Sequence, residues 1–328
     1  MAELTYLEAI QQGIDEEMAK DKNVLIFGED VGGDKGGVFG VTKGLAAKYG
    51  DKRVFNTPLT EIAIAGMGVG LGLIGFRPIA EFQFADYILP AVNQLNSEAA
   101  RMRYRSKGDW TVPAVFRAPY GGGVRGGFYH SQSTEKIFAG QPGLRVVTPS
   151  SPYDAKGMIK KAIRSDDPVI FYEHKRLYRL LKAEVPDTDY TVPIDKANVV
   201  RQGDDLTVIA YGAMLQHALT AAEKLATDGI STEIVDVRSL YPLDRETLVT
   251  AAKKTGKVLL ITEDNKESTI MSEIAAIIAE EALFDLDAPI RRLAGPDVPA
   301  MPYAVGLERA FLVDEEQVYA GMKALASY

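Results

Sequence analysis

The sequence predicts a two-domain α/β protein in which each domain is a mainly parallel sheet flanked by helices. Short apolar runs such as 23–27, 144–148 and 258–263 have the length and composition of buried strands. They alternate with amphipathic segments of helical length, an order typical of parallel sheets covered on both faces. The 328 residues, 46% of them hydrophobic, are enough to build two such cores.

The first predicted domain spans residues 1–185. Apolar residues recur at helical spacing near its start, at Leu7, Ile10, Ile14 and Met18. Ser151 and Pro152 suit the N-cap and the first turn of a helix that runs to about residue 164. The pattern predicts strands at 23–27, 53–55, 77–84, 112–117, 144–148 and 168–173.

A second domain is predicted over residues 205–328, after a linker at 186–204 in which the periodicity fades into Pro, Asp and Thr. Strands and helices then alternate again. The predicted strands lie at 205–211, 231–240 and 258–263, and the predicted helices at 215–228, 244–255 and 272–283.

The composition argues against several functions, among them nucleic-acid binding, thiolate chemistry and membrane spanning. A net charge of −8, with both signs mixed along the chain, argues against nucleic-acid binding. The chain has no cysteine, which excludes disulfides and thiolate chemistry, and it has no apolar run long enough to span a bilayer. These features predict a cytoplasmic protein that binds neither nucleic acid nor membrane.

The motif Gly70-Leu-Gly72-Leu-Ile-Gly75 fits the dinucleotide fingerprint of an oxidoreductase. In that fingerprint a strand precedes the glycines and a helix follows them. Here a helical pattern at 61–70 precedes the motif and a strand pattern at 78–84 follows it. The context therefore disfavours a dinucleotide site.

Glu61 opens an otherwise apolar helical segment, close to Leu59 and Ile62. A glutamate in the first turn of a helix is common, because its charge complements the helix dipole. A carboxyl group held among apolar side chains would also lose solvation, which suits proton exchange with a bound ring near neutral pH. The pattern alone leaves both interpretations open.

Residues 120–133, YGGGVRGGFYHSQS, place five glycines and Arg125 before His130, which is one of three histidines in the chain. The polar residues that follow are suited to fixing the tautomer of this imidazole. A loop histidine without a role is an equally open interpretation. No G-x-S-x-G elbow accompanies it, which disfavours a serine hydrolase.

Several longer motifs together resemble the β subunit of thiamine-diphosphate-dependent 2-oxoacid dehydrogenases. They are GEDVG at 28–32, NTPLTEIAIAG at 56–66, RPIAEFQFADY at 77–87, APYGGGVRGGFYHSQS at 118–133 and DPVIFYEHKRLYR at 167–179. The similarity spans the whole chain. The combination of GGGVRGG, HSQS and EHKRLYR most resembles the branched-chain 2-oxoacid type.

This resemblance implies a pyrimidine-type thiamine-diphosphate-binding domain followed by a transketolase C-terminal-like domain. It implies an α2β2 tetramer, active only with its α subunit, with thiamine diphosphate at the α/β interface and magnesium held mainly by the α chain. The implied reaction is oxidative decarboxylation of a 2-oxoacid with acyl transfer to a lipoyl group on an acyltransferase component. Pyruvate and acetoin enzymes are neighbouring alternatives, and a non-catalytic scaffold is a further one.

The resemblance also assigns roles to individual residues. Glu61 matches the glutamate that bonds the aminopyrimidine ring, Leu59 the residue that lends it a backbone contact, and Tyr87 the aromatic residue that packs on it. His130 matches the histidine that assists acyl transfer to the lipoyl group. Arg125 is implied to lie with His130 at the mouth of the lipoyl channel.

Two further implications concern a metal and a partner. A potassium ion is implied near 162–168, where related chains often carry Asp then Asn and this chain has Ser165 and Asp167; Asp167 is carried over as its ligand. The C-terminal domain is implied to build the tetramer and to dock the acyltransferase. An acidic cluster there suits a basic partner, although a solvated helix end explains it equally well: Glu280, Glu281, Asp285 and Asp287.

Overall fold

The computed structural model describes residues 2–328, and the chain divides into two compact units. The first unit consists of the chain up to Tyr120 together with Ile137–Ile194, and the second of Gly121–Lys136 together with Asp195–Tyr328. Both units are α/β, which confirms the predicted fold class. The segment around His130 groups with the second unit, although the sequence pattern places it inside the first predicted domain.

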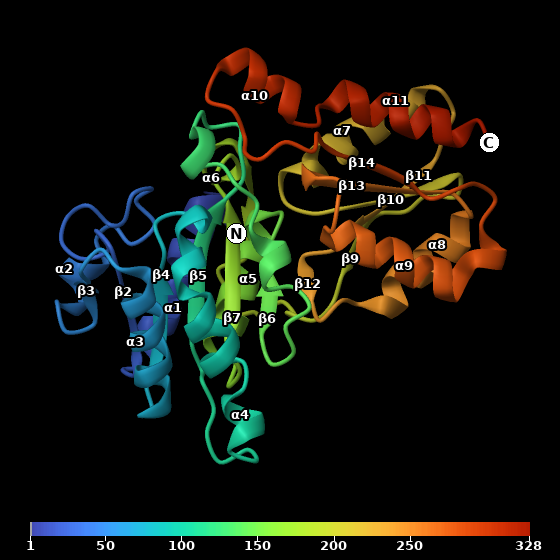
Figure 1. Cartoon of the computed structure of the whole chain (residues 1–328). Helices are drawn as coiled ribbons and strands as arrows, with labels where there is room; N and C mark the ends of the chain where they lie inside the picture. Colours follow the sequence, from blue (N-terminus) through green and yellow to red (C-terminus); the bar gives the residue numbers. More distant parts are fainter. Residues whose placement is uncertain (1) are drawn as a thin grey trace. The chain divides into compact units, whose positions relative to one another are not determined.

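The first unit is built on a parallel sheet in which strands β6, β7, β5, β4, β2 and β3 lie side by side in that order (Figure 1). Their bounds are β2 (Val24–Gly28), β3 (Val54–Asn56), β4 (Arg77–Glu81), β5 (Val115–Tyr120), β6 (Arg145–Val147) and β7 (Val169–His174). An antiparallel pair joins β1 (Ala2–Thr5) to β8 (Lys182–Val185). The strand predicted at 112–117 starts only at Val115, after Pro113, which has no N–H to donate.

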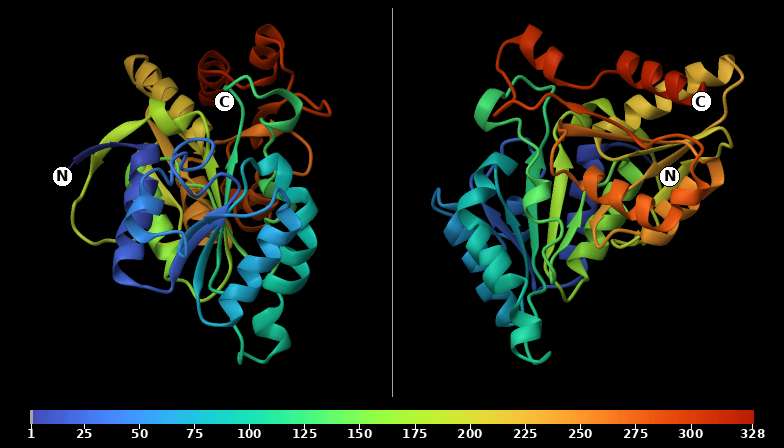
Figure 2. Two further views of the ribbon diagram at one scale, coloured as in Figure 1. Left: turned by 90° about the vertical axis from the view of Figure 1, so that its left-hand side faces the viewer. Right: turned by 45° about the vertical axis from the view of Figure 1, so that its right-hand side comes forward.

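Helices cover both faces of this sheet. Figure 2 (left) shows α1 on one face and α3 on the opposite face. The bounds are α1 (Tyr6–Lys20), α2 (Leu45–Tyr49), α3 (Glu61–Leu73), α4 (Met102–Arg105), α5 (Pro152–Ile163) and α6 (Leu177–Leu180), with the helical turns η1 (Ala85–Ala91) and η2 (Gln94–Ala99). The continuous burial of β2, β5 and β7 follows from this two-sided cover.

Local signals in the sequence explain where the two long helices of one face begin. Thr5 and Glu8 form a capping box at the start of α1. Ser151 caps α5 as predicted, since its hydroxyl accepts a hydrogen bond from the backbone N–H of Asp154 at 3.1 Å. The two helices approach closely at Gly13, where an added Cβ would lie 2.6 Å from a methyl carbon of Ile159.

The glycine motif at 70–75 follows a helical stretch, as predicted, because its first residues belong to α3. The helix packs tightly on its sheet through its glycines. A Cβ on Gly68 would lie 2.8 Å from the ring of Phe116, and one on Gly72 would lie 3.2 Å from the ring of Pro113. Gly68 and Gly72 thus serve close packing, whereas a Cβ on Gly70 or Gly75 would meet no atom within 4 Å.

The second unit has its own sheet, with the strand order β14, β13, β10, β11, β9. The first four strands run parallel and β9 pairs antiparallel with β11. Helices α7 and α11 lie on one face, and α8 and α9 on the other (Figure 1). The strands of this sheet are β9 (Asn198–Arg201), β10 (Leu206–Ala210), β11 (Thr232–Asp236), β13 (Val258–Asn265) and β14 (Arg291–Gly295), and β12 (Ser239–Tyr241) lies outside it.

Three helices of this unit lie within two residues of the predicted bounds, and two further helices follow them. Their bounds are α7 (Ala213–Thr227), α8 (Arg245–Thr255), α9 (Ile270–Ala282), α10 (Val305–Phe311) and α11 (Glu315–Ala326), with the turns η3 (Gly127–Tyr129) and η5 (Leu283–Asp285). The single strand predicted at 231–240 is wrong. The chain breaks between β11 and β12 at Arg238, whose φ of 36° no strand accommodates and whose guanidinium donates to the carbonyl of Lys196 at 2.9 Å.

A buried ion network joins the central strands of the first unit. Arg117 on β5 is fully buried, and its guanidinium donates to Glu173 on β7 at 2.6 and 2.7 Å and to Glu81 at the end of β4. Burial works to lower the pKa of Arg117, but the carboxylates of Glu173 and Glu81 raise it above its ordinary value. Tyr178 completes the network by donating to Glu173 at 2.6 Å.

We predict that Arg117→Met strongly destabilises the fold. The change leaves the carboxyl groups of Glu81 and Glu173 buried without their cation, which costs about 3–5 kcal/mol in comparable cases. Chemical denaturation of the purified protein measures this loss directly. Arg179→Met, at an exposed position of α6, is the matched control and should have little effect. Equal stability of the two variants would contradict the role of the network.

Candidate active site

Three side chains meet at the carboxyl edge of the first sheet. Glu29 follows β2, Glu61 opens α3 after β3, and Tyr87 lies in η1 after β4. Because these strands are parallel, their carboxyl ends lie at one edge, where ligands bind in open α/β sheets. The structure therefore brings together Glu61 and Tyr87, both predicted from sequence, and adds Glu29.

The charges of this group influence one another. Burial raises the pKa of Glu29, and the carboxylates of Glu61 and Asp30 raise it further. Burial also raises the pKa of the Tyr87 phenol, with added effects from Asp86, Glu61 and Glu29. Glu29 is buried, and its Oε1 has no hydrogen-bond partner within residues 2–328. Such an acceptor marks this edge as a place where a polar group would be bound.

The apolar enclosure expected around Glu61 is only partly present. Ile64 is buried, but the side chain of Leu59 is 80% exposed and that of Ile62 is 48% exposed. The enclosure of Glu61 is therefore incomplete within this unit, because the N-terminal turn of α3 lies at its surface. Leu59 and Ile62 therefore form an exposed apolar surface next to the carboxylate of Glu61, and such surfaces are typical of binding sites.

An aromatic series connects Tyr87 to the ion network. The ring of Tyr87 meets that of Phe84 edge-on at 6.0 Å, and Phe84 meets Phe39 edge-on at 5.5 Å. Phe39 contacts Tyr178 at 5.2 Å, and Tyr178 donates to the buried Glu173. Aromatic pairs in these arrangements are favourable. The orientation of Tyr87 is thus supported from the centre of the sheet.

The second predicted group lies in Gly121–Lys136, which we call the glycine loop. It carries Arg125, which is exposed, and His130, which is half-buried. Four residues have left-handed backbone angles: Gly121 (φ 86°), Gly123 (φ 77°), Arg125 (φ 60°) and Gly127 (φ 64°). A Cβ on Gly122 would lie 2.2 Å from the sulfur of Met301. The glycines thus permit both the turns and the close packing of this loop.

Two buried carboxylates of the second unit accept hydrogen bonds from the glycine loop. The backbone N–H of Gly122 donates to Glu263 Oε1 at 2.5 Å. The N–H groups of Gly123 and Arg125 both donate to Glu308 Oε1, at 3.1 and 3.0 Å. Successive amides that converge on an anion form a nest, and such hydrogen bonds are strengthened by the charge.

The C-terminal end of the glycine loop contains a buried acid, Glu135. Its Oε1 accepts from the Tyr211 hydroxyl at 2.8 Å, and its Oε2 has no hydrogen-bond partner among the described residues. Burial raises the pKa of Glu135 to about 8, with a further contribution from Asp264. Asp264 in turn pairs with Lys136 at 3.0 Å. Glu135 is therefore largely protonated near neutral pH.

The predicted potassium ligand lies elsewhere, in the turn after α5. Asp167 Oδ1 accepts from Arg103 Nε at 2.6 Å, and Oδ2 lies 3.9 Å from Arg145. Within residues 2–328, no group of three or more His, Cys, Asp or Glu side chains could hold a metal ion. A potassium ion at this carboxylate would have to share it with a guanidinium, so the potassium site stays a prediction.

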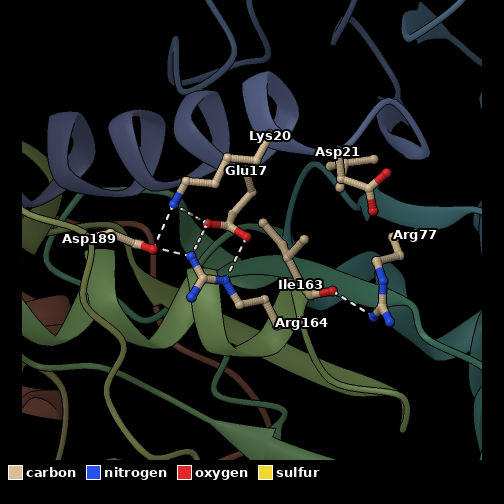
Figure 3. A pocket seen from close by; sticks show the side chains of 8 residues that line it. Glu17, Lys20, Asp21, Arg77, Ile163, Arg164 and Asp189 are labelled. Carbon is tan, nitrogen blue, oxygen red and sulfur yellow. Dashed lines mark hydrogen bonds and ion pairs between the residues drawn. The ribbon is translucent and has the colours of Figure 1, made fainter.

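The cavity shown in Figure 3, of about 350 Å³, is not a second candidate. Its lining includes Arg77 at the start of β4, at the amino edge of the sheet, whereas Glu61 follows a carboxyl end. Four of its charged side chains pair with one another, namely Glu17, Lys20, Arg164 and Asp189. Arg164 pairs with Glu17 at 2.6 Å and with Asp189 at 2.8 Å. Through these ion pairs Asp189, which the sequence pattern places in the linker, contacts residues of α1 and the end of α5.

The predicted acidic cluster is partly neutralised within its own unit. Glu281 pairs with Arg245 at 2.5 Å, and Asp285 with Lys253 at 3.5 Å. Next to it Phe284 is fully exposed. No helix in the described part of the chain is both long and apolar enough to cross a membrane.

Comparison with known proteins agrees with this geometry. The chain matches the family model "Transketolase, pyrimidine binding domain" over residues 2–180 and "Transketolase, C-terminal domain" over residues 195–318. It is 60% identical to the 2-oxoisovalerate dehydrogenase subunit beta of Bacillus subtilis (strain 168), with 100% of both chains covered. The chain belongs to the family of 2-oxoacid dehydrogenase β subunits.

Further comparisons refine this family membership. The pyruvate dehydrogenase E1 component subunit beta of Bacillus subtilis (strain 168) is 47% identical over 90% of this chain and 91% of its own length. A solved structure, "Split gene transketolase, inactive beta4 tetramer", covers 99% of this chain and 98% of its own, with a TM-score of 0.78 at 23% identity, and supports the fold alone. The predicted resemblance to the branched-chain type of this thiamine-diphosphate-dependent family is confirmed.

Sequence reasoning missed four acids of this β subunit, namely Glu29, Glu135, Glu263 and Glu308. Glu29 lies in the quoted motif GEDVG directly after a buried strand, so its position at a carboxyl edge was open to prediction. Glu263 ends an apolar run in the same way. Glu308 has no comparable local signal, because its role depends on amides 183 and 185 residues away.

We predict that Glu135→Gln reduces the pH dependence of stability. The folded protein keeps the Glu135 proton up to a pKa of about 8, whereas the ordinary value is 4.5. The stability that this group contributes is therefore complete below pH 4.5 and is lost as the pH rises to about 8. Melting temperatures at pH 5.5 and pH 9 should differ less in the variant than in the wild type. Glu267→Gln, at an exposed position, is the control, and an unchanged difference would contradict the assignment.

Proposed function

We propose that the chain is the β subunit of a branched-chain 2-oxoacid dehydrogenase, which decarboxylates 2-oxoacids oxidatively and acylates a lipoyl group on an acyltransferase. The observation that carries this proposal is the 60% identity over full length with a 2-oxoisovalerate dehydrogenase subunit beta, against 47% for a pyruvate relative. The position of Glu61 and Tyr87 at one sheet edge supports it. A pyruvate or acetoin enzyme is the alternative.

The carboxyl edge of the first sheet fits an aminopyrimidine ring. Tyr87 offers a supported aromatic face, the exposed Leu59 offers apolar surface and backbone, and Glu61 offers a carboxylate for the ring nitrogen. Thiamine diphosphate, when bound, supplies the electron sink that allows carbon dioxide to leave. Glu61 would accept and return a proton at its carboxylate oxygen, and the buried Glu29 would keep a second acid within reach of it.

The glycine loop would serve the second half of the reaction. His130 would donate a proton to the lipoyl sulfur as the acyl group is transferred, and Arg125, which is exposed, would lie at the entrance used by the lipoyl arm. We place the partner α chain opposite the exposed surface of Leu59 and Ile62 in an α2β2 tetramer. Magnesium would be held mainly by that α chain, and the assembly would be cytoplasmic.

The acyltransferase would dock on the second unit. The fully exposed Phe284 beside Glu280 and Asp287 offers an apolar anchor within an acidic rim, which suits a basic partner domain. Potassium at Asp167 completes the proposed set of ions. It would require the ion to be accommodated next to Arg103.

The substrate proposal predicts a preference for branched acids. The chain co-expressed with its genomic α partner, with thiamine diphosphate and magnesium, should decarboxylate 3-methyl-2-oxobutanoate and 4-methyl-2-oxopentanoate with kcat/KM about 10-fold or more above pyruvate, since added methyl groups in an apolar pocket have effects of this size. The β chain alone is the blank. A preference for pyruvate would move the protein to the alternative class, and no turnover with any substrate would contradict catalysis.

The role of His130 predicts a selective defect. His130→Ala should lower reductive acylation of a lipoyl domain by about 100-fold, the usual size of a general-acid contribution, and leave decarboxylation with an artificial electron acceptor nearly unchanged. His217→Ala, at a half-buried position of α7, is the matched control. Equal losses in the two assays would refute the assignment.

A further inference from the structure

The glycine loop is positioned by the second unit, although its sequence interrupts the first. It leaves β5 after Tyr120 and returns toward β6 at Ile137, yet its contacts group it with Asp195–Tyr328. A hydrogen bond from the N–H of Gly121 to the carbonyl of Gln132 at 3.3 Å closes the loop on itself. The segment that bears His130 is therefore held by residues more than a hundred positions further along the chain.

Glu308 is the main anchor of the N-terminal half of this loop. It lies on α10, it is only 5% exposed, and one of its oxygens accepts from the amides of both Gly123 and Arg125. Two amides two positions apart can reach one oxygen only while the intervening backbone is curled. The two hydrogen bonds to Glu308 therefore form only in the curled conformation of the loop, and they stabilise that conformation.

The conformation at Arg125 would be unfavourable without this anchor. Its φ of 60° lies in the left-handed region, which a residue with a side chain rarely adopts. Such a conformation persists when the surroundings over-determine it. Here the amide of Arg125 itself donates to Glu308, and the packing of Gly122 on Met301 fixes the preceding turn.

We propose that Glu308 is a positioning residue for acyl transfer, which holds the glycine loop in the conformation that presents His130. This inference rests on the proposed function of the chain and extends it. It assigns to the second unit a part in the acylation half-reaction that is separate from tetramer building and acyltransferase docking. Glu308 touches neither substrate nor cofactor in this account, because it acts only through the backbone amides of the loop.

The first measurement is hydrogen–deuterium exchange in the assembled enzyme with its α partner. In Glu308→Ala, the amides of Gly123 and Arg125, within residues 122–125, should exchange about 10-fold faster or more, because each of them loses a charge-assisted hydrogen bond. Glu308→Gln keeps an acceptor oxygen without the charge and should show a smaller increase. Glu316→Ala, at an exposed position of α11, is the matched control and should leave the exchange unchanged.

The second measurement compares the two half-reactions in the same variants. Glu308→Ala should lower the kcat of reductive acylation about 10-fold, with decarboxylation to an artificial acceptor within about 2-fold of wild type. Glu308→Gln should recover most of the acylation rate. If Glu308→Ala fails to assemble with the α partner, the test rests on Glu308→Gln. Its exchange at residues 123 and 125 should then be faster than in the wild type, and unchanged exchange would contradict the proposal.

Three results would overturn the proposal. Unchanged exchange at residues 122–125 would mean that Glu308 does not hold the loop. Faster exchange with normal acylation would mean that the held conformation does not matter, and equal losses in both half-reactions would mean a general structural role. The hydrogen–deuterium exchange measurement does not depend on catalysis. If the proposed function is wrong, the wild type shows no decarboxylation; if the role of Glu308 is wrong, exchange in Glu308→Ala is unchanged.

Discussion

A guanidinium buried between two carboxylates is the constraint on which the carboxyl edge of the first sheet depends. Arg117 cannot lose its charge, and it is fully excluded from water, so Glu81 and Glu173 must stay within hydrogen-bond distance of it. These residues belong to three adjacent strands. The network therefore fixes the ends of β4, β5 and β7 relative to one another, and the segments that leave those ends start from fixed positions.

The segment after β4 shows how this constraint reaches the candidate active site. It carries Phe84 and Tyr87, and their rings connect through Phe39 to Tyr178, whose hydroxyl donates to Glu173. The side of Tyr87 that faces the protein is thus supported by packed rings. Its neighbour Glu61 stands at the start of a helix whose glycines pack directly on the same sheet. Rigid support of this kind is what a bound ring needs for orientation.

Much of the architecture follows from local sequence, whereas the site depends on distant contacts. The apolar runs and the Ser151-Pro152 start of α5 are local signals, and the structure contains the corresponding elements. Arg117 gives no such signal, because its partners are 36 and 56 residues away. The break at Arg238 and the anchoring of the glycine loop by Glu308 depend on contacts of the same long range. The sequence pattern also did not predict the exposure of Leu59, because it does not distinguish a core leucine from an exposed one.

We propose that Glu61, held at this sheet edge, would hold the aminopyrimidine ring of thiamine diphosphate and so assist removal of the proton from carbon 2 of the thiazolium. The most direct test is the rate at which that proton exchanges with deuterium in the assembled enzyme, followed by NMR after acid quench. Glu61→Gln, which keeps the shape and removes the carboxylate, should slow this exchange by about 100-fold or more while thiamine diphosphate still binds. An unchanged exchange rate in the variant would contradict it.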